Sequence, residues 1–333
     1  MKLFNLGDLN WKQTQLIYHA LAYENIESLV LSSPSDTYMS VGLHQNPQDE
    51  LDLNFCVDNN IGIFRREIGG GTVLLDKHQL FYNLILHRKN LIVPYAPEAF
   101  FRKFLQPVIQ TYRELGISVE YRPLCDLVVR DKKISGNGGG EIGDCKVLGG
   151  SILLDFNYEL MAKAINLADD LKKKFLELMN NNLTTVKKEL EIVPLKDDIC
   201  SILVKKFEEL LGPMTKGKIE SKITNKMMEL DKQYSSDKWL FQRGTKQIWR
   251  EIKIREGEIM IYKLFNFQNS YGRVICEIKK NLVKEVIFSN RFPLSHSNQR
   301  EIKSRLIGIE FNSDKLLYDI VEMIKSYGDG IVD

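Results

Sequence analysis

The chain has 333 residues, long enough for two domains at the usual size of about 150 residues each. Hydrophobic residues make up 44% of it and charged residues 27%, which excludes a disordered or fibrous protein. The net charge is only +2, and no basic stripe is interleaved with aromatic residues. We therefore expect no nucleic-acid partner.

Five cysteines are scattered along the chain without CxxC pairs or metal-ligand spacing, which is typical of reduced intracellular thiols. The first residues become polar too early for a signal peptide, and no apolar run approaches the roughly 18 residues of a membrane span. The expected location is the cytoplasm, with no membrane partner. The sequence leaves the identity of any metal site unknown.

The first part of the chain mixes helix and strand patterns. Residues 10–24 have apolar side chains at helical spacing. Strand candidates rich in β-branched and aromatic residues follow at 26–31, 38–42, 61–66, 80–86, 119–121, 127–129 and 151–156. A helix is predicted over 97–116, and Pro107 should kink or divide it because proline lacks a backbone donor.

The second part of the chain changes character twice. Residues 160–237 are helical in pattern and rich in Lys and Glu. Four antiparallel strand candidates follow at 248–254, 258–264, 273–278 and 283–288, and helices are predicted at 298–306 and 313–327. This last region reads as a small α+β domain.

The most informative segment, residues 65–76, contains three consecutive glycines, Gly69 to Gly71, between two strand-like runs. Glycines permit positive φ and let backbone N–H groups approach an anionic ligand closely. Arg65 and Arg66 add fixed positive charge. A tight turn with solvated arginines is the alternative, and a glycine triplet alone favours it. The segment matches neither a Walker A motif nor a dinucleotide fingerprint.

A second glycine-rich segment, residues 132–143, begins with Lys132 and Lys133. A mobile ammonium beside a backbone anion nest can neutralise a phosphate or a carboxyl oxygen that develops negative charge. An exposed hairpin with solvated lysines is the better interpretation of either lysine alone. Because the first glycine segment is also present, an anion-binding lysine becomes the preferred interpretation.

The RRxxGGGxVxxD pattern at 65–76, the KISG run at 133–136 and the GGSILL run at 149–154 together resemble the lipoate-protein ligase family in order and spacing. Upstream, Val41-Gly42 and Gln45-Asn46 are similar to the stretch that precedes the arginines in that family. The C-terminal α+β region resembles the accessory domain of full-length ligases.

The resemblance implies an α+β fold with a mixed central β-sheet flanked by helices, as in biotin ligases and octanoyltransferases. We therefore expect a catalytic domain over 1–180, a helical connecting region over 181–237 and a small α+β accessory domain over 238–333. The implied activity is ATP-dependent formation of lipoyl-AMP, followed by transfer of the lipoyl group to a lysine of a carrier. That carrier is expected to be a lipoyl domain or a glycine-cleavage H-like protein.

The resemblance also implies cofactors and site residues. ATP and Mg²⁺ are expected, with lipoate or octanoate as the acid. Lys133 is expected to be catalytic and to bind the carboxylate and the phosphate of lipoyl-AMP. The other residues carried over by position to the acyl and adenylate site are Arg66, Gly69, Gly70, Gly71, Thr72, Asp126, Ser135 and Gly136.

Two departures from the family keep alternatives open. Cys125 stands where asparagine is usual, and Gly149 stands where histidine is frequent. An ATP-independent octanoyl or lipoyl transferase that uses Cys125 as nucleophile is one alternative, although a free cysteine is more often a small buried hydrophobe. A non-catalytic lipoate-binding module is the other. The sequence leaves open the carrier, the choice between lipoate and octanoate, and the oligomeric state.

Overall fold

The structure is a computed structural model that describes residues 1–333 apart from 243–248, 256, 268–269, 290–291, 328–330 and 333. The chain divides into two compact units, Met1–Gly244 and Thr245–Asp333. Within the described residues, no helix combines the length and apolar character needed to cross a membrane.

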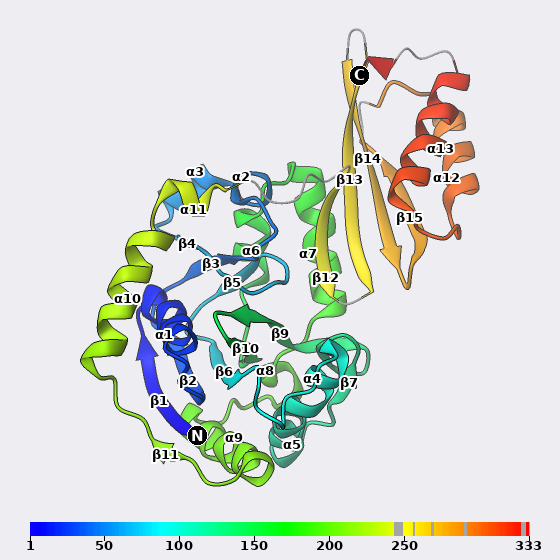
Figure 1. The fold of residues 1–333 in the computed structure, drawn as a ribbon. Helices are drawn as coiled ribbons and strands as arrows, with labels where there is room; N and C mark the ends of the chain where they lie inside the picture. Colours follow the sequence, from blue (N-terminus) through cyan, green and yellow to red (C-terminus); the bar gives the residue numbers. More distant parts are fainter. Residues whose placement is uncertain (243–248, 256, 268–269, 290–291, 328–330, 333) are drawn as a thin grey trace. The chain divides into compact units, whose positions relative to one another are not determined.

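An eight-stranded mixed sheet forms the centre of the first unit, in the order β11-β1-β2-β6-β10-β9-β8-β7 (Figure 1). Its strands are β1 (Lys2–Leu9), β2 (Ser28–Pro34), β6 (Gln79–His87), β7 (Glu120–Arg122), β8 (Asp126–Val129), β9 (Lys132–Ile142), β10 (Cys145–Leu153) and β11 (Thr215–Lys216). Strand β1 pairs in parallel with β2 and β11, and the other neighbours are antiparallel. The predicted mixed central sheet is confirmed.

A smaller sheet of three strands, in the order β4-β3-β5, carries the first glycine motif. Its members are β3 (Tyr38–Val41), β4 (Gly62–Arg65) and β5 (Val73–Leu75). The glycine triplet lies in the connection between β4 and β5. Short helices α2 (Pro47–Glu50) and α3 (Leu53–Asp58) lie between β3 and β4 in the chain.

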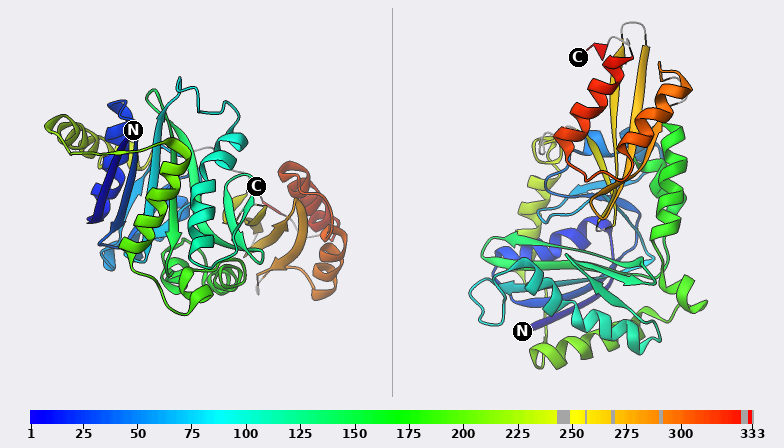
Figure 2. Two further views of the ribbon diagram at one scale, coloured as in Figure 1. Left: turned by 90° about the horizontal axis from the view of Figure 1, so that it is seen from below. Right: turned by 90° about the vertical axis from the view of Figure 1, so that its right-hand side faces the viewer.

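Different helices cover the two faces of the large sheet (Figures 1 and 2). On one face, which we call the α5 face, Leu31, Tyr82 and Leu148 join a cluster with α4 (Pro97–Phe104), α5 (Gln106–Glu114) and α9 (Lys196–Leu211). On the other, the α1 face, Val30 and Phe81 pack with α1 (Trp11–Tyr23), and α10 (Ser221–Tyr234) packs on α1. Successive residues of a regular strand point to opposite faces, so the clusters fix the orientation of the strand side chains away from register shifts.

The helical part of the chain belongs to the first unit. Residue Leu105 separates α4 from α5, so the division predicted at Pro107 is confirmed. The remaining helices are α6 (Tyr158–Ala164), α7 (Asp169–Asn182), α8 (Val186–Leu190) and α11 (Asp237–Leu240). The segment 181–237, expected to connect two domains, is packed into the first unit through α9 and α10.

The second unit is a small α+β domain, as predicted. Strands β12 (Arg250–Arg255), β13 (Glu258–Phe267), β14 (Ser270–Lys279) and β15 (Leu282–Phe288) form an antiparallel sheet, and β16 (Ile331–Val332) pairs with β13. Helices α12 (His296–Leu306) and α13 (Ser313–Ser326) bury Ile302 and Ile320 against it. Ile248, the first residue of a predicted strand, lies outside the described residues.

Strand β9 corrects the expected backbone of the second glycine segment. We expected a glycine nest or an exposed hairpin after Lys133, and the structure instead has a strand paired with β8 on one side and β10 on the other. Glycine disfavours strands because it has no side chain to pack. Here the hydrogen bonds to two neighbouring strands override that preference.

Candidate active site

The glycine loop between β4 and β5 lies against the α1 face of β9 and β10. The carbonyl oxygen of Gly69 is 3.1 Å from the position that a Cβ on Gly138 would take. Side-chain atoms of Ile68 come as close to the corresponding positions of Gly140 and Gly149, at 3.4 and 3.0 Å. A larger residue at any of these positions would push the loop away. Four half-buried glycines on this face of the sheet form what we call the glycine floor: Gly136, Gly138, Gly140 and Gly149.

Two contacts hold the glycine loop from outside. Gly70 has a φ of 106°, the left-handed region that favours glycine, and its carbonyl oxygen lies 1.9 Å from the place of a Cβ on Gly42. Residue 42 must therefore be glycine if the glycine loop is to lie where it does. Thr72 Oγ1 donates a hydrogen bond to Gln45 Oε1 at 2.8 Å. Thr72, a predicted site residue, thus anchors the end of the glycine loop to the Gln45-Asn46 stretch.

Arg66 holds the same loop from inside. Its Nη1 donates to the carbonyl oxygen and the hydroxyl of Ser40 at 2.9 and 3.2 Å, and its Nη2 donates to the carbonyl oxygens of Gly69 and Gly71 at 3.1 and 2.8 Å. Burial lowers the pKa of this guanidinium. Arg66 was expected to line the acyl and phosphate site, and the structure places its charge against the backbone carbonyl oxygens of the glycine loop.

The residues on either side of Arg66 point to a different part of the chain. Trp239 Nε1 donates to the carbonyl oxygen of Arg65 at 2.9 Å, and the Arg65 guanidinium donates to the carbonyl oxygen of Gln242. The Glu67 carboxylate accepts from the hydroxyl of Tyr234 at 2.5 Å. Helices α10 and α11 are therefore fastened to the strand that leads into the glycine loop. These contacts join residues about 170 positions apart, and no local sequence signal indicates them.

A buried histidine supports the same strand end. His19 Nδ1 lies 2.7 Å from the carbonyl oxygen of Gln15, and His19 Nε2 accepts from the backbone N–H of Glu67 at 3.3 Å. Both contacts are satisfied by the neutral ring with its proton on Nδ1. Burial lowers the pKa of His19 to about 4, which keeps this neutral form down to acidic pH.

Strands β8 and β9 bring Lys133 and Asp126 together. The Lys133 Nζ lies 2.7 Å from Asp126 Oδ1, and the carboxylate side chain is 1% exposed whereas the lysine side chain is 17% exposed. Leu127 packs in the α5-face cluster, so Asp126 points to the α1 face, where the glycine floor lies. The buried carboxylate holds the ammonium in place, and the exposed part of the lysine stays accessible to an anionic ligand.

The structure does not bring every predicted residue to this face. Gly136 lies in the glycine floor. Ser135 is fully buried, and its Oγ donates to the carbonyl oxygen of Ser151 at 2.7 Å and lies 3.0 Å from the hydroxyl of Tyr82, a residue of the α5 face. A register shift between β8 and β9 at this point turns Ser135 away from Lys133.

Cys125 also lies with the α5 face. Its Sγ donates to the carbonyl oxygen of Asn137 at 3.3 Å, and Asn137 Nδ2 donates back to the carbonyl oxygen of Cys125 at 2.8 Å. The side chain packs against the α5-face cluster, whereas Lys133 and Asp126 point to the opposite side of the sheet. The thiol and the lysine therefore do not face one another.

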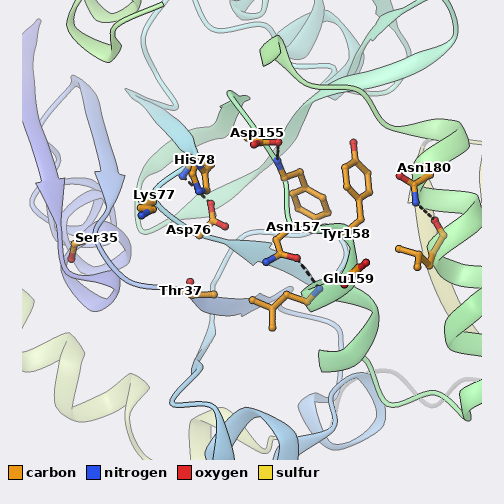
Figure 3. A pocket seen from close by; sticks show the side chains of 13 residues that line it. Ser35, Thr37, Asp76, Lys77, His78, Asp155, Asn157, Tyr158, Glu159 and Asn180 are labelled. Atoms are coloured by element: carbon orange, nitrogen blue, oxygen red, sulfur yellow. Dashed lines mark hydrogen bonds between the residues drawn. The ribbon is translucent and has the colours of Figure 1, made fainter. Parts of the chain in front are cut away.

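A cavity of about 660 Å³ lies where the start of β6 and the end of β10 meet α6 and α7 (Figure 3). Asp76 and His78 line one side of it, and Asp155 and Tyr158 line the other. The Tyr158 hydroxyl donates to the carbonyl oxygen of Leu183 at 3.5 Å, and Leu183 pairs with Lys133. Burial raises the pKa of the Asp76 carboxyl. The volume is typical of a small-molecule site.

Within the part of the chain that the structure describes, no three His, Cys, Asp or Glu side chains are grouped so that they could hold a metal ion. The most buried carboxylate of the site, Asp126, is engaged by Lys133. Mg²⁺ usually binds through one or two carboxylates and substrate phosphates rather than through an all-protein cage. A magnesium ion at this site would therefore depend on the phosphates of a nucleotide.

Comparison with known proteins decides the family. A model described as the Lipoyl protein ligase A/B catalytic domain matches residues 8–208. The chain belongs to this family. Lipoate-protein ligase LplJ of Bacillus subtilis is 24% identical over 264 residues, which cover 73% of this chain and 76% of that protein. Octanoyltransferase LipM of Geobacillus kaustophilus is 25% identical over 237 residues, which cover 62% and 83%.

Solved structures of the family share the fold. The bi-partite lipoate protein ligase of Thermoplasma acidophilum, from a study that includes its E2 lipoyl domain, has a TM-score of 0.65 at 21% identity and covers 74% of this chain and 98% of that chain. Lipoate-protein ligase A bound with ATP has a TM-score of 0.61 at 20% identity and covers 72% and 98%. Both likenesses agree with the mixed sheet and its flanking helices.

Proposed function

We propose that this protein is an ATP-dependent lipoate-protein ligase that forms lipoyl-AMP and transfers the lipoyl group to a lysine of a lipoyl carrier. The observation that carries the proposal is the Lys133–Asp126 pair on the same face of the sheet as the glycine floor and its covering loop. The names of three related proteins support the parts of this proposal. The name of LplJ supports lipoate as the acid, that of the ATP-bound ligase supports ATP as the nucleotide, and that of the Thermoplasma ligase with its E2 lipoyl domain supports a lipoyl domain as the carrier.

In the first step, a carboxylate oxygen of the acid attacks the α-phosphorus of ATP, and pyrophosphate leaves. The barrier comes mainly from aligning two anions, so positioning and fixed positive charge supply the catalysis without a protein nucleophile. The Lys133 ammonium has three N–H donors, and Asp126 orients it. Lys133 would bind the carboxylate and the α-phosphate together.

In the second step, the amine of the carrier lysine attacks the acyl carbon and AMP leaves. The acyl-adenylate is an anhydride that water can hydrolyse, so the site must exclude water between the two steps. The glycine loop, held by Arg66 and Gln45 and packed over the glycine floor, forms such a cover. An acyl chain laid along the floor would lie beneath it only after the loop has lifted, because Gly69 and Ile68 pack directly on the floor.

The cavity at Asp76 and Asp155 offers space for the nucleoside part of ATP, because Leu183 links its wall to Lys133. Its carboxylates suit ribose hydroxyls and amino groups better than phosphates. Mg²⁺ would enter with the phosphates of ATP.

An ATP-independent octanoyltransferase is a second candidate, because LipM is among the relatives. It would need an acyl-thioester at Cys125. The position of that thiol on the α5 face, away from Lys133, argues against it.

The test uses the purified full chain with lipoate, a purified lipoyl domain and either ATP or no nucleotide. The expected result is release of AMP and pyrophosphate and a mass increase of one lipoyl group on the carrier, only when ATP is present. A mass increase without ATP that is lost in Cys125→Ser would support the transferase. If neither AMP release nor a change in carrier mass is detected, both proposed enzymatic activities are overturned.

A further inference from the structure

A buried amide without a partner lies on the α1 face of the sheet. Asn83, in the middle of β6, is 5% exposed, and its carboxamide forms no hydrogen bond with any residue that the structure describes. Its Oδ1 lies 3.1 Å from the place of a Cβ on Gly149, so the amide extends over the glycine floor. Buried polar groups in native proteins almost always have a partner, and each exception needs an explanation.

A second such group lies beside it. Ser32, in β2, is 1% exposed, and its hydroxyl has no hydrogen-bond partner among the described residues. Ser32 pairs with Phe81 and Asn83 pairs with Val30, so the two polar residues are diagonal neighbours on the same face. The Ser32 hydroxyl, buried without a partner among the described residues, destabilises the free protein, and a ligand that reaches both Ser32 and Asn83 would complete their hydrogen bonds.

The sheet register places these groups at a suitable distance from the reacting centre. Asn83 pairs with Gly149, which pairs with Gly138, five positions along β9 from Lys133. At about 4.8 Å between strands and about 3.3 Å per residue, the Cα atoms of Asn83 and Lys133 are on the order of 19 Å apart. Both side chains point to the same face, and a medium-length acyl chain with its carboxylate at Lys133 would reach toward Asn83 once the glycine loop, which packs on the floor, is displaced.

We propose that Asn83 and Ser32 are specificity-determining residues that contact the distal end of the acyl substrate. They select a chain that ends in a hydrogen-bonding group, such as the cyclic disulfide of lipoate, over the plain alkyl end of octanoate. The proposal rests on the proposed function for the identity of the acid. Sulfur is a weak acceptor that an amide N–H and a hydroxyl can both approach, whereas a methyl end would leave both groups unpaired.

The experiment compares Asn83→Leu and Ser32→Ala with the wild-type protein, and Ser28→Ala is the matched control. Ser28 lies on the same strand and face, but its hydroxyl already donates to the carbonyl oxygen of Ile26 at 3.0 Å. Binding of lipoate and of octanoate is measured separately by calorimetry without ATP, and kcat/KM for adenylation is measured with each acid. Melting temperatures of the free proteins are recorded.

The wild-type protein is expected to prefer lipoate. Asn83→Leu should reduce the lipoate-to-octanoate ratio of affinities by about tenfold, as loss of a neutral hydrogen bond does, with little change for octanoate. Ser32→Ala should reduce the ratio in the same direction, and Ser28→Ala should leave it unchanged. The melting temperature of free Asn83→Leu should equal or exceed that of the wild type, because an unpaired amide is removed.

Equal losses for both acids, an unchanged ratio, or a wild-type preference for octanoate would overturn the proposal. The proposal would also be overturned if neither lipoate nor octanoate bound to the wild-type protein. Failure of the ligase proposal is a separate result: lipoate would still bind with the expected dependence on Asn83, but no adenylate would form when ATP is added.

Discussion

Replacement of Gly42 by alanine tests whether the position of the glycine loop controls activity. The added Cβ would lie 1.9 Å from the carbonyl oxygen of Gly70, whereas ordinary contacts begin at 3.4 Å. The two atoms must therefore separate by 1.5 Å, the difference between these distances. A displacement of about 1 Å in a positioning element can reduce a rate about 100-fold, so we expect kcat/KM for adenylation to fall by that order. Overpacking of this kind also costs about 1–3 kcal/mol of stability.

The assay is pyrophosphate release at limiting and saturating lipoate, with thermal unfolding to confirm that each variant is folded. Gly69→Ala is the control, because its Cβ would have no neighbour nearer than 3.9 Å although it lies in the same loop. We expect Gly69→Ala to stay far more active than Gly42→Ala. Gly42→Ala activity within a few-fold of the wild type, or an equal loss in both variants, would refute the reasoning.

Three further predictions concern residues around the site. Burial lowers the pKa of His19 from 6.5 to about 4, so above pH 6.5 the ring is neutral whether the chain is folded or not, and below it only the unfolded chain takes up the proton. The free energy of unfolding should then fall by up to about 3 kcal/mol between pH 6.5 and 4, and urea denaturation should show a flatter profile in His19→Gln. Cys125→Ser should keep ATP-dependent ligation, and mass spectrometry should detect no acyl-enzyme; loss of ligation with a trapped thioester in the wild type would contradict this. Tyr234→Phe removes a hydrogen bond of 2.5 Å to Glu67 and should cost roughly 1–3 kcal/mol in the same denaturation assay, and an unchanged midpoint would contradict it.

Local sequence patterns predicted those helices and strands whose residue types favour the backbone conformation that the structure shows. Pro107 lacks a donor, and the helix is broken just before it, at Leu105, as expected. The sequence did not predict β1, because Gly7 interrupts its short pattern, or β9, because Gly136 to Gly140 contain no β-branched or aromatic residue. Both strands depend on hydrogen bonds to neighbours that are distant in the chain.

The candidate site was only partly predictable for the same reason. Family resemblance led to Lys133 and Asp126, and the structure places them 2.7 Å apart. It did not indicate that Arg66 points into the glycine loop, or that a register shift turns Ser135 to the other face. Those orientations follow from tertiary packing. The sequence alone did not indicate the unpaired amide of Asn83, because its burial in β6 depends on the tertiary structure.

The most direct test of the central claim is adenylate formation by the lysine variants. Purified wild-type protein, Lys133→Ala and Lys133→Arg are each mixed with ATP and lipoate, without a carrier, and lipoyl-AMP is quantified by mass spectrometry. The wild type should form lipoyl-AMP, and Lys133→Ala should fold normally and form at least 100-fold less, as expected when a fixed transition-state charge is lost. Lys133→Arg keeps the charge in a different geometry and should retain more activity than Lys133→Ala. Undiminished lipoyl-AMP in Lys133→Ala would contradict the assigned role of this lysine, and no lipoyl-AMP from the wild type would contradict the ligase itself.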